Sequence, residues 1–474
     1  NTLGAEDYGI YNVVAGVVTM FSFISGAMST ACQRYFSFDI GKNDGEHLKV
    51  TFSLTVTIYF LIAIIVVLLA ETIGLWFLLK KLAIPLERVS AAHWVYHFSV
   101  ISFFFTIIAA PFMADIIAHE NMNIYAYVSI VEVGLKLLVA FLINLCSTDS
   151  LIFYGFLMLF VTIIVTTIYC VICKIKYKEC KYKFCWDKAY VKELFSFTGW
   201  NLFGAASGVL KNQMINVLLN QYFNPIVITA KSVSMQVRSA VSSFSQNFSI
   251  ALRPQIIKNY SAGEYDDSLK YTFRGSKFTY YLMWIFTLPL VLEMKGVLTL
   301  WLKEPPDYAV VFTQLALIDV LVESLSFPLM TLAQATGRIR LYQSVVGGIQ
   351  LLTFPFCWII LQLGYPAWSV QVIGIIFTFI ALISRLLILR NLTRFSVVAF
   401  LKTVVIPCTY VTFVSFFIGF VISNFNSSNV YFMLINILFE FFLVLATCYF
   451  LGLNKNEKQY VVAFFKNKLH KIIP

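Results

Sequence analysis

Residues 50–79 read VTFSLTVTIYFLIAIIVVLLAETIGLWFLL, thirty positions with one charged side chain, Glu71. The hydrocarbon core of a bilayer is roughly 30 Å thick, so a helix needs about 20 mostly apolar residues to cross it. The run is apolar on all sides, unlike an amphipathic surface helix, and it does not alternate as a spanning strand would. This stretch therefore predicts a transmembrane helix.

Similar runs recur along the whole chain of 474 residues. Hydrophobic residues make up 59% of it and charged residues 12%, against roughly 25% charged in a typical soluble domain. We predict an all-α polytopic membrane protein with about 13 visible transmembrane helices, at residues 9–32, 50–79, 93–114, 124–145, 151–173, 194–220, 226–252, 278–302, 308–334, 341–362, 367–390, 400–423 and 429–452.

The 35 Lys and Arg residues are divided unequally between the two sets of alternate loops. One set, together with the C-terminal tail, holds 26 of them, the opposite set holds four, and five lie within helices. Cytoplasmic loops carry the excess of Lys and Arg, so the tail and the loop 174–192 are predicted to be cytoplasmic. The first residues would then lie outside. We expect one further helix before them, which gives fourteen in the full protein and a bacterial inner-membrane location.

The two parts of the chain also resemble each other at an offset near 220. Matched anchors include Asn1 and Asn220, Arg34 and Arg253, Glu71 and Glu293, and Pro111 and Pro328. Six helices separate equivalent positions, so both copies would cross the membrane in the same direction. This predicts two six-helix bundles with a pseudo-two-fold axis along the membrane normal, as in transporters with parallel repeats. The last two helices stand outside the repeat.

The resulting domain order has five parts. We predict an N-terminal helix bundle lacking its first helix at 1–173, a basic cytoplasmic linker at 174–193, a C-terminal helix bundle at 194–392, two extra transmembrane helices at 393–452 and a basic cytoplasmic tail at 453–474.

Residues 3–14, LGAEDYGIYNVV, and 33–37, QRYFS, resemble the Wzx-type polysaccharide flippases, as do 117–123, IAHENMN, and the basic tail. These belong to the multidrug/oligosaccharidyl-lipid/polysaccharide (MOP) exporter superfamily, and the resemblance covers essentially the whole chain. It implies a central cavity and flipping of an undecaprenyl-diphosphate-linked oligosaccharide across the inner membrane, for surface polysaccharide or O-antigen (lipopolysaccharide) assembly. Polymerase and assembly proteins are the expected partners besides the lipid bilayer. The first helix of that fold is absent here.

A diphosphate is costly to move through hydrocarbon, so such a flippase should offer cations in a wet cavity. Lys231 and Arg238 are seven positions apart on one helix face, and Lys211 lies on the preceding helix. Together they could hold a diphosphate, with Asn216 and Gln236 lining the cavity. The alternative is that the cations reach an interface or pair with carboxylates.

Two further pairs are candidates for ion coupling. Asp319 and Glu323 lie four positions apart and could titrate and couple transport to a proton gradient, partner the cations, or face the outer interface. Glu132 and Lys136 share a helix face, and a neutralised internal pair is the simpler interpretation. Pro111 and Pro328 are repeat-equivalent prolines within helices, where they could act as paired hinges.

No catalytic or cofactor motif is evident, so we expect neither an enzyme nor a bound cofactor. The cysteines Cys170, Cys173, Cys180 and Cys185 faintly resemble a metal site, but no histidine is near in the sequence, and no metal is predicted. We also expect no nucleic-acid partner.

Two other functions compete with a flippase. A drug/cation antiporter of the same superfamily predicts an acidic cavity, whereas the helices between 194 and 252 are basic inside. A membrane polysaccharide polymerase or glycosyltransferase predicts a large extracytoplasmic loop with catalytic side chains, whereas the outer loops here are short.

Overall fold

The computed structural model describes residues 10, 11, 14, 22–76, 78, 85–143, 149–425 and 430–459, and the regular structure in these ranges is entirely helical. The first part of the predicted span 9–32 and most of the predicted tail 453–474 lie outside the described residues. Contacts divide the chain into two compact units. Unit 1 comprises Asn1–Ala206 with Ile257–Glu264, and unit 2 comprises Ser207–Ile256 with Tyr265–Pro474.

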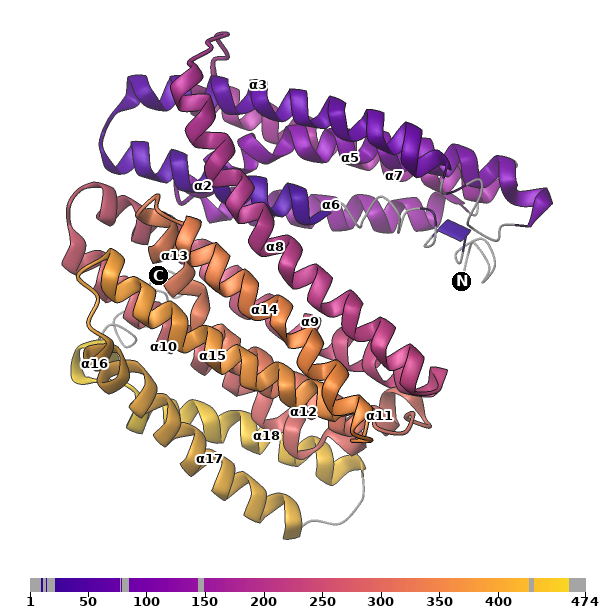
Figure 1. Ribbon diagram of the computed structural model, residues 1–474, viewed down its shortest axis with the longest axis vertical. Coiled ribbons are helices and arrows are strands. Elements are labelled where there is room, and N and C mark those ends of the chain that lie inside the picture. Colours follow the sequence, from indigo (N-terminus) through magenta and orange to yellow (C-terminus); the bar gives the residue numbers. More distant parts are fainter. Residues whose placement is uncertain are drawn as a thin grey trace, which may run out of the picture. The chain divides into compact units, whose positions relative to one another are not determined.

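Unit 1 is built around α5 (Val89–Ala118), which packs against α2, α3, α6 and α7. Figure 1 shows α3, α5 and α7 running side by side. The other elements are α2 (Ser22–Gly41), α3 (Gly45–Leu69) with its π-helical extension Ala70–Gly74, the 3-10 turn Leu86–Arg88, α6 (Met122–Leu142), α7 (Ser150–Lys176) and the 3-10 turn Lys178–Cys180.

Two aspartates fix where helices of unit 1 begin. Oδ1 of Asp44 accepts a hydrogen bond from the backbone N–H of His47 at 3.0 Å, at the start of α3. Oδ1 of Asp149 accepts one from Leu151 at 2.9 Å, at the start of α7. Each cap satisfies a backbone donor that the helix itself leaves unpaired.

Unit 2 is built around α10 (Tyr265–Leu292), which packs against α12, α13, α17 and α18. After α10 the chain bends by 78° into α11 (Met294–Leu302). The remaining elements are α12 (Ala309–Ser324), α13 (Ser326–Ala335), α14 (Arg340–Gln362), α15 (Ser369–Leu392), α16 (Val397–Phe400), the π-helix Leu401–Val405, α17 (Ile406–Phe425), α18 (Val430–Thr447) and the π-helix Cys448–Gly452.

Two long helices contribute to both units: α8 (Lys188–Tyr222) and α9 (Pro225–Ser261). The boundary between the units falls inside α8 rather than in the predicted linker 174–193. That segment is packed, since Glu179 and Cys180 are buried and the hydroxyl of Tyr190 lies 2.9 Å from that of Thr51. The predicted five-part domain order stays a prediction.

Among the described residues, nine helices are long and apolar enough to cross a membrane, or ten if α10 and α11 form one bent span. These coincide with predicted spans between 50 and 173 and between 278 and 452. The other three predicted spans fall on α2, α8 and α9, which are helical but do not meet the same test of length and apolarity. The chain therefore has an all-helical membrane fold, while the count of thirteen or fourteen crossings and the two-bundle layout remain predictions.

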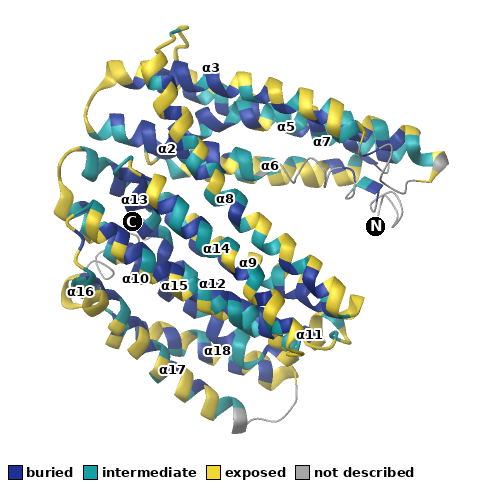
Figure 2. Cartoon of the chain, viewed as in Figure 1, coloured by how far each residue is buried: buried dark blue, intermediate teal, exposed yellow. Residues whose placement is uncertain are grey.

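The outer surface is apolar, as lipid contact requires. In Figure 2 exposed residues recur along α17, and they include Tyr410, Phe413, Phe417 and Phe420, spaced along one helix face. The aromatic face of α17 would be strongly unfavourable in water, so we expect it to contact lipid. Other helices differ in burial: 72% of the most apolar stretch of α12–α13 is buried inside the protein, against 11% of that of α6.

The helix boundaries repeat along the chain at a nearly constant interval. Helix α2 ends at Gly41 and α9 at Ser261, 220 positions later, while α5 ends at Ala118 and α13 at Ala335, 217 positions later. The turns match too. Positive φ angles occur at Asn43 and Gly263 after the first pair, and at Glu120 and Gly337 after the second. These matched ends support the internal repeat, since each turn closes its helix in the same left-handed conformation.

The two prolines predicted as paired hinges differ in their helices. Pro328 has no N–H for the carbonyl of Ser324, and Ser324 is the last residue of α12, so the helix breaks there and resumes as α13. Ser276 stabilises the break by donating a hydrogen bond to the Leu325 carbonyl at 3.0 Å. Pro111 lies inside α5, which continues unbroken from Val89 to Ala118. Their shared role as hinges stays a prediction.

Candidate substrate site

The candidate site is built on α8 and α9, the most polar of the long helices. Helix α9 begins at Pro225, and a proline at the first helical position loses no hydrogen bond because that N–H has no partner within the helix. Just before it, Oδ1 of Asn224 accepts a hydrogen bond from the backbone N–H of Val227 at 3.3 Å. Its serines bond to their own helix: Ser234 donates to the Lys231 carbonyl at 2.7 Å and Ser245 to that of Ser242 at 2.9 Å. Such backbone pairing satisfies hydroxyls without a partner helix.

Arg238 is the centre of an ion-pair network in unit 2. Its Nη1 donates to Oδ2 of Asp319, and its Nη2 donates to Oε2 of Glu323 at 2.6 Å. Thr378 on α15 donates its hydroxyl proton to the other oxygen of Asp319, also at 2.6 Å. Asp319 is buried, whereas 34% of the Glu323 side chain is exposed. The guanidinium therefore binds both carboxylates of the acidic pair in a charge-assisted arrangement.

This network corresponds to one of the alternatives that the sequence leaves open. Asp319 and Glu323 form ion pairs with Arg238, one of the cations predicted to bind substrate. Thr378 was not predicted, because a threonine in an apolar helix gives no local signal of what it contacts. Whether Arg238 also binds substrate stays a prediction.

Lys231 has a different environment from Arg238. Only 5% of it is exposed, and the described part of the chain offers its Nζ no hydrogen bond or ion pair. Lys211, Arg238 and Cys357 lie within electrostatic range of it, and Lys211 is in turn within range of Asp319. The cluster thus has three basic side chains, Lys211, Lys231 and Arg238, and two carboxylates, so its charge is +1 when all five groups are ionised.

The remaining predicted site residues lie on these helices or elsewhere. Asn216 is half-buried on α8, and Gln236 is exposed on α9. Glu132 and Lys136 form an ion pair of 2.6 Å on α6 of unit 1, with both side chains more than a third exposed. This is the neutralised pair that the sequence indicates, and its part in ion coupling stays a prediction.

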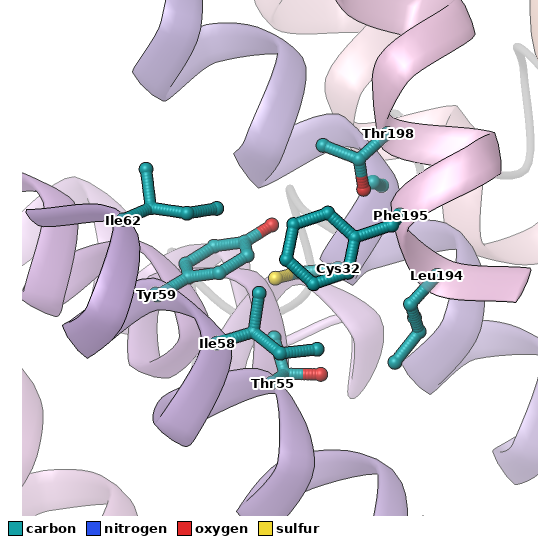
Figure 3. A pocket seen from close by; sticks show the side chains of 9 residues that line it. Cys32, Thr55, Ile58, Tyr59, Ile62, Leu194, Phe195 and Thr198 are labelled. Carbon is teal, nitrogen blue, oxygen red and sulfur yellow. The ribbon is translucent and has the colours of Figure 1, made fainter. Parts of the chain in front are cut away.

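A separate pocket in unit 1 lies between α2, α3 and the start of α8 (Figure 3). Tyr59 faces into it beside Cys32, and its hydroxyl donates to the carbonyl of Met28. The lining is otherwise mostly apolar: Ala31, Thr55, Ile58, Ile62, Leu194, Phe195 and Thr198. With no charged side chain, this pocket does not suit a phosphate group.

Comparison with known proteins identifies the fold. No family model matches the sequence, and no curated protein sequence matches it. Among solved structures, an outward-facing multidrug resistance MATE family transporter of the MOP superfamily has a TM-score of 0.73 at 10% identity, covering 82% of this chain and 88% of its own. A MATE transporter in the bent conformation gives 0.73 at 11% identity, with 85% and 90% covered.

A third solved structure is a MOP superfamily transporter from Pyrococcus furiosus, described as having a binding pocket of reverse polarity that suggests a different function. Its TM-score is 0.68 at 10% identity, with 82% of this chain and 88% of that chain covered. At such low identity the likeness concerns the backbone arrangement, and the chain thus has the fold of the MATE transporters of the MOP superfamily.

Proposed function

We propose that the protein flips an undecaprenyl-diphosphate-linked oligosaccharide across the bacterial inner membrane by alternating access, for assembly of a surface polysaccharide. The observation that carries this proposal is the surplus of basic over acidic side chains in unit 2, where Lys211, Lys231 and Arg238 lie near only two carboxylates, those of Asp319 and Glu323. The transporter fold supports the general activity.

The chemistry of the cargo explains why this surplus matters. A diphosphate carries its charge into a medium where an unpaired charge is heavily penalised. Lys231 is buried and has no carboxylate partner among the described residues, which is itself costly, and an anionic ligand would remove that cost. Arg238 adds a guanidinium group with five N–H donors, of which Asp319 and Glu323 accept one each, so the group can also donate to a phosphate oxygen.

The test replaces Lys231 and Arg238 with Ala, separately and together, and measures surface polysaccharide at matched expression. We expect export to fall in each single variant and to be lost in the double variant. Lys270→Ala is the matched control, since Lys270 is an exposed cation paired with Asp267 at 2.8 Å outside the cluster. Undiminished export in the double variant would contradict the proposed diphosphate site.

A second candidate is a drug/cation antiporter of the same superfamily, and the acidic pair Asp319 and Glu323 is the observation that favours it. An organic cation could replace Arg238 at these carboxylates. This function predicts that Asp319→Asn with Glu323→Gln abolishes drug resistance in a sensitive host and leaves surface polysaccharide intact. The P. furiosus structure is described as having a binding pocket of reverse polarity, which is consistent with anionic and cationic substrates being carried by different proteins of this fold.

A further inference from the structure

Five side chains with metal-binding atoms gather in unit 1, remote from the residues discussed so far. Asp115 and His119 lie at the end of α5, Cys173 lies at the end of α7, and Glu179 and Cys180 lie in the 3-10 turn that follows α7. They form two groups that share Asp115: Asp115, Cys173 and Cys180; and Asp115, His119 and Glu179. Within each group all donor atoms lie within 4.8 Å of one another.

The two oxygens of Asp115 face different neighbours. Oδ2 lies 3.2 Å from Sγ of Cys180. Oδ1 lies 3.5 Å from Nδ1 of His119 and accepts no well-formed hydrogen bond from the described residues. Nε2 of His119 is turned toward Glu179, with 3.0 Å between it and Oε1. Nδ1 of His119 also lies 3.1 Å from the backbone carbonyl oxygen of Asp115. Asp115 is thus the residue that the two groups share, with the thiols near one of its carboxylate oxygens and the imidazole near the other.

The cluster is buried at its centre. Asp115 and Cys173 are fully buried, and Cys180 is 1% exposed. A buried carboxylate oxygen without a hydrogen bond is unfavourable. A cation bound by Asp115 and the two thiols would offset this cost.

Neighbouring side chains hold the cluster in place. The ring of Tyr177 stacks on that of His119 with centroids 4.3 Å apart. The amide of Asn121 donates to the Tyr177 hydroxyl at 2.7 Å, and Lys176 donates to the Asn121 oxygen at 2.9 Å. Supporting contacts of this kind fix the orientation of metal ligands.

We propose that this cluster binds one Zn²⁺ ion, with Asp115, Cys173 and Cys180 as the protein ligands and with His119 and Glu179 as the polar neighbours beside the second oxygen of Asp115. Two sulfur donors and one oxygen donor, with a water molecule as the fourth ligand, suit the four-coordinate tetrahedral geometry of zinc. Binding requires both thiols to release their protons to solvent, after which the thiolates bond to the metal. The role is structural, since the three ligands are buried where α5 and α7 end in unit 1, whereas the candidate substrate site belongs to unit 2.

The competing explanation is an ion-pair cluster without metal. Burial disfavours a charged His119, but its attraction to the carboxylates of Asp115 and Glu179 outweighs this and raises the pKa of His119 to about 10. In that state His119 would be a cation between two carboxylates, and both cysteines would remain thiols. The two explanations differ in whether the thiols are ionised and bound.

The internal repeat shows that the fold itself does not need these side chains. At the offset of 217 set by the ends of α5 and α13, Asp115 corresponds to Leu332 and His119 to Thr336. At the offset of 219 set by the starts of α7 and α15, Cys173 corresponds to Leu392. The second copy makes the same helix ends with side chains that cannot bind a metal.

The sequence argument against a metal was the lack of a nearby histidine. The fold supplies one, because it brings His119 of α5 beside a turn that lies about sixty positions later in the chain. Of the four cysteines considered from the sequence, two fall in the cluster, and Cys170 and Cys185 do not. Those two cysteines are therefore matched controls.

The experiment measures metal bound to the full chain, purified in detergent and dialysed against a metal-free buffer. We expect close to one zinc per chain by elemental analysis in the wild type and in the Cys170→Ser/Cys185→Ser control. Cys173→Ser/Cys180→Ser and Asp115→Asn should each lose most of it. Metal-free wild type, or equal zinc in the cluster variants and the wild type, would overturn the proposal.

A second measurement uses the wild type alone, so that a variant that fails to fold cannot obscure the result. Replacing zinc with Co²⁺ should produce the thiolate charge-transfer absorption and visible bands of a tetrahedral cobalt site. Chelation should make Cys173 and Cys180 reactive toward an alkylating reagent, while Cys170 and Cys185 react equally before and after. Unchanged alkylation of Cys173 and Cys180 on chelation would favour the ion-pair cluster.

Discussion

Two buried carboxyl groups of unit 2, those of Glu457 and Glu440, differ in whether a cation lies beside them. Oε2 of Glu457 lies 2.6 Å from Nζ of Lys277, and both side chains are about 5% exposed or less. Glu440 on α18 is fully buried, and neither of its oxygens has a hydrogen-bond partner among the described residues. The first carboxylate needs its partner, whereas the second has none to lose.

Glu457→Gln should therefore destabilise the protein. It leaves the Lys277 ammonium buried without a counter-charge, which costs about 3–5 kcal/mol. We expect a clearly lower unfolding temperature in detergent, and Lys277→Met/Glu457→Leu should recover part of it because no unpaired charge remains. An unchanged unfolding temperature in Glu457→Gln would show that the pair does not form.

Glu440→Gln should have a far smaller effect in the same assay. The glutamine keeps the shape of the side chain and removes a group whose ionised form has no partner in the apolar interior. We expect a change of less than about 1 kcal/mol, or a slight stabilisation. A loss as large as that of Glu457→Gln would mean that Glu440 is ionised and paired in the folded protein.

At the scale of helices, local sequence determines most of what is seen. The apolar runs predict the helices because a span must satisfy its own backbone, and Pro328 explains the end of α12 through a single missing donor. Contacts between side chains on different helices cannot be predicted in this way. Arg238 meets Asp319 about eighty positions away, and Asp115 meets Cys180 sixty-five positions away. No periodicity within one helix contains such contacts.

Restoring the missing donor at Pro328 should extend the helix through the break. In Pro328→Ala we expect slower amide hydrogen exchange around residues 324–328, because a new bond can form to the Ser324 carbonyl. Surface polysaccharide export should fall if bending at this break is needed for transport. Pro111→Ala is the matched control, and with α5 already continuous it should change exchange little. Equal changes in both variants would show that the break does not depend on Pro328.

At the scale of the whole molecule, the support for the predicted repeat comes from matched helix ends, whereas sequence anchors such as Arg34 and Arg253 lie inside helices. Asn43 and Gly263 occupy the same left-handed turn position although their side chains differ, and so do Glu120 and Gly337. The equivalent turns of the two copies thus share a backbone conformation although the residues that form them differ. What remains a prediction is the direction in which each helix crosses the bilayer.

The distribution of Lys and Arg gives that direction a direct test. If the tail is cytoplasmic, a C-terminal green fluorescent protein fusion should fluoresce and a C-terminal alkaline phosphatase fusion should be inactive. Fusions placed after residue 305, in a predicted outer loop, should give the reverse pattern. Active phosphatase at the C-terminus would invert the predicted topology.

Helices α8 and α9 each begin in one unit and end in the other, at the divisions 206/207 and 256/257. The chain thus passes between the units inside continuous helices rather than through loops at both divisions. Gly208 follows the first division by two residues, and Pro254 precedes the second by two. A glycine and a proline, the residue types at which helices most readily bend, therefore lie next to the two divisions, and we expect bending of α8 and α9 to occur there.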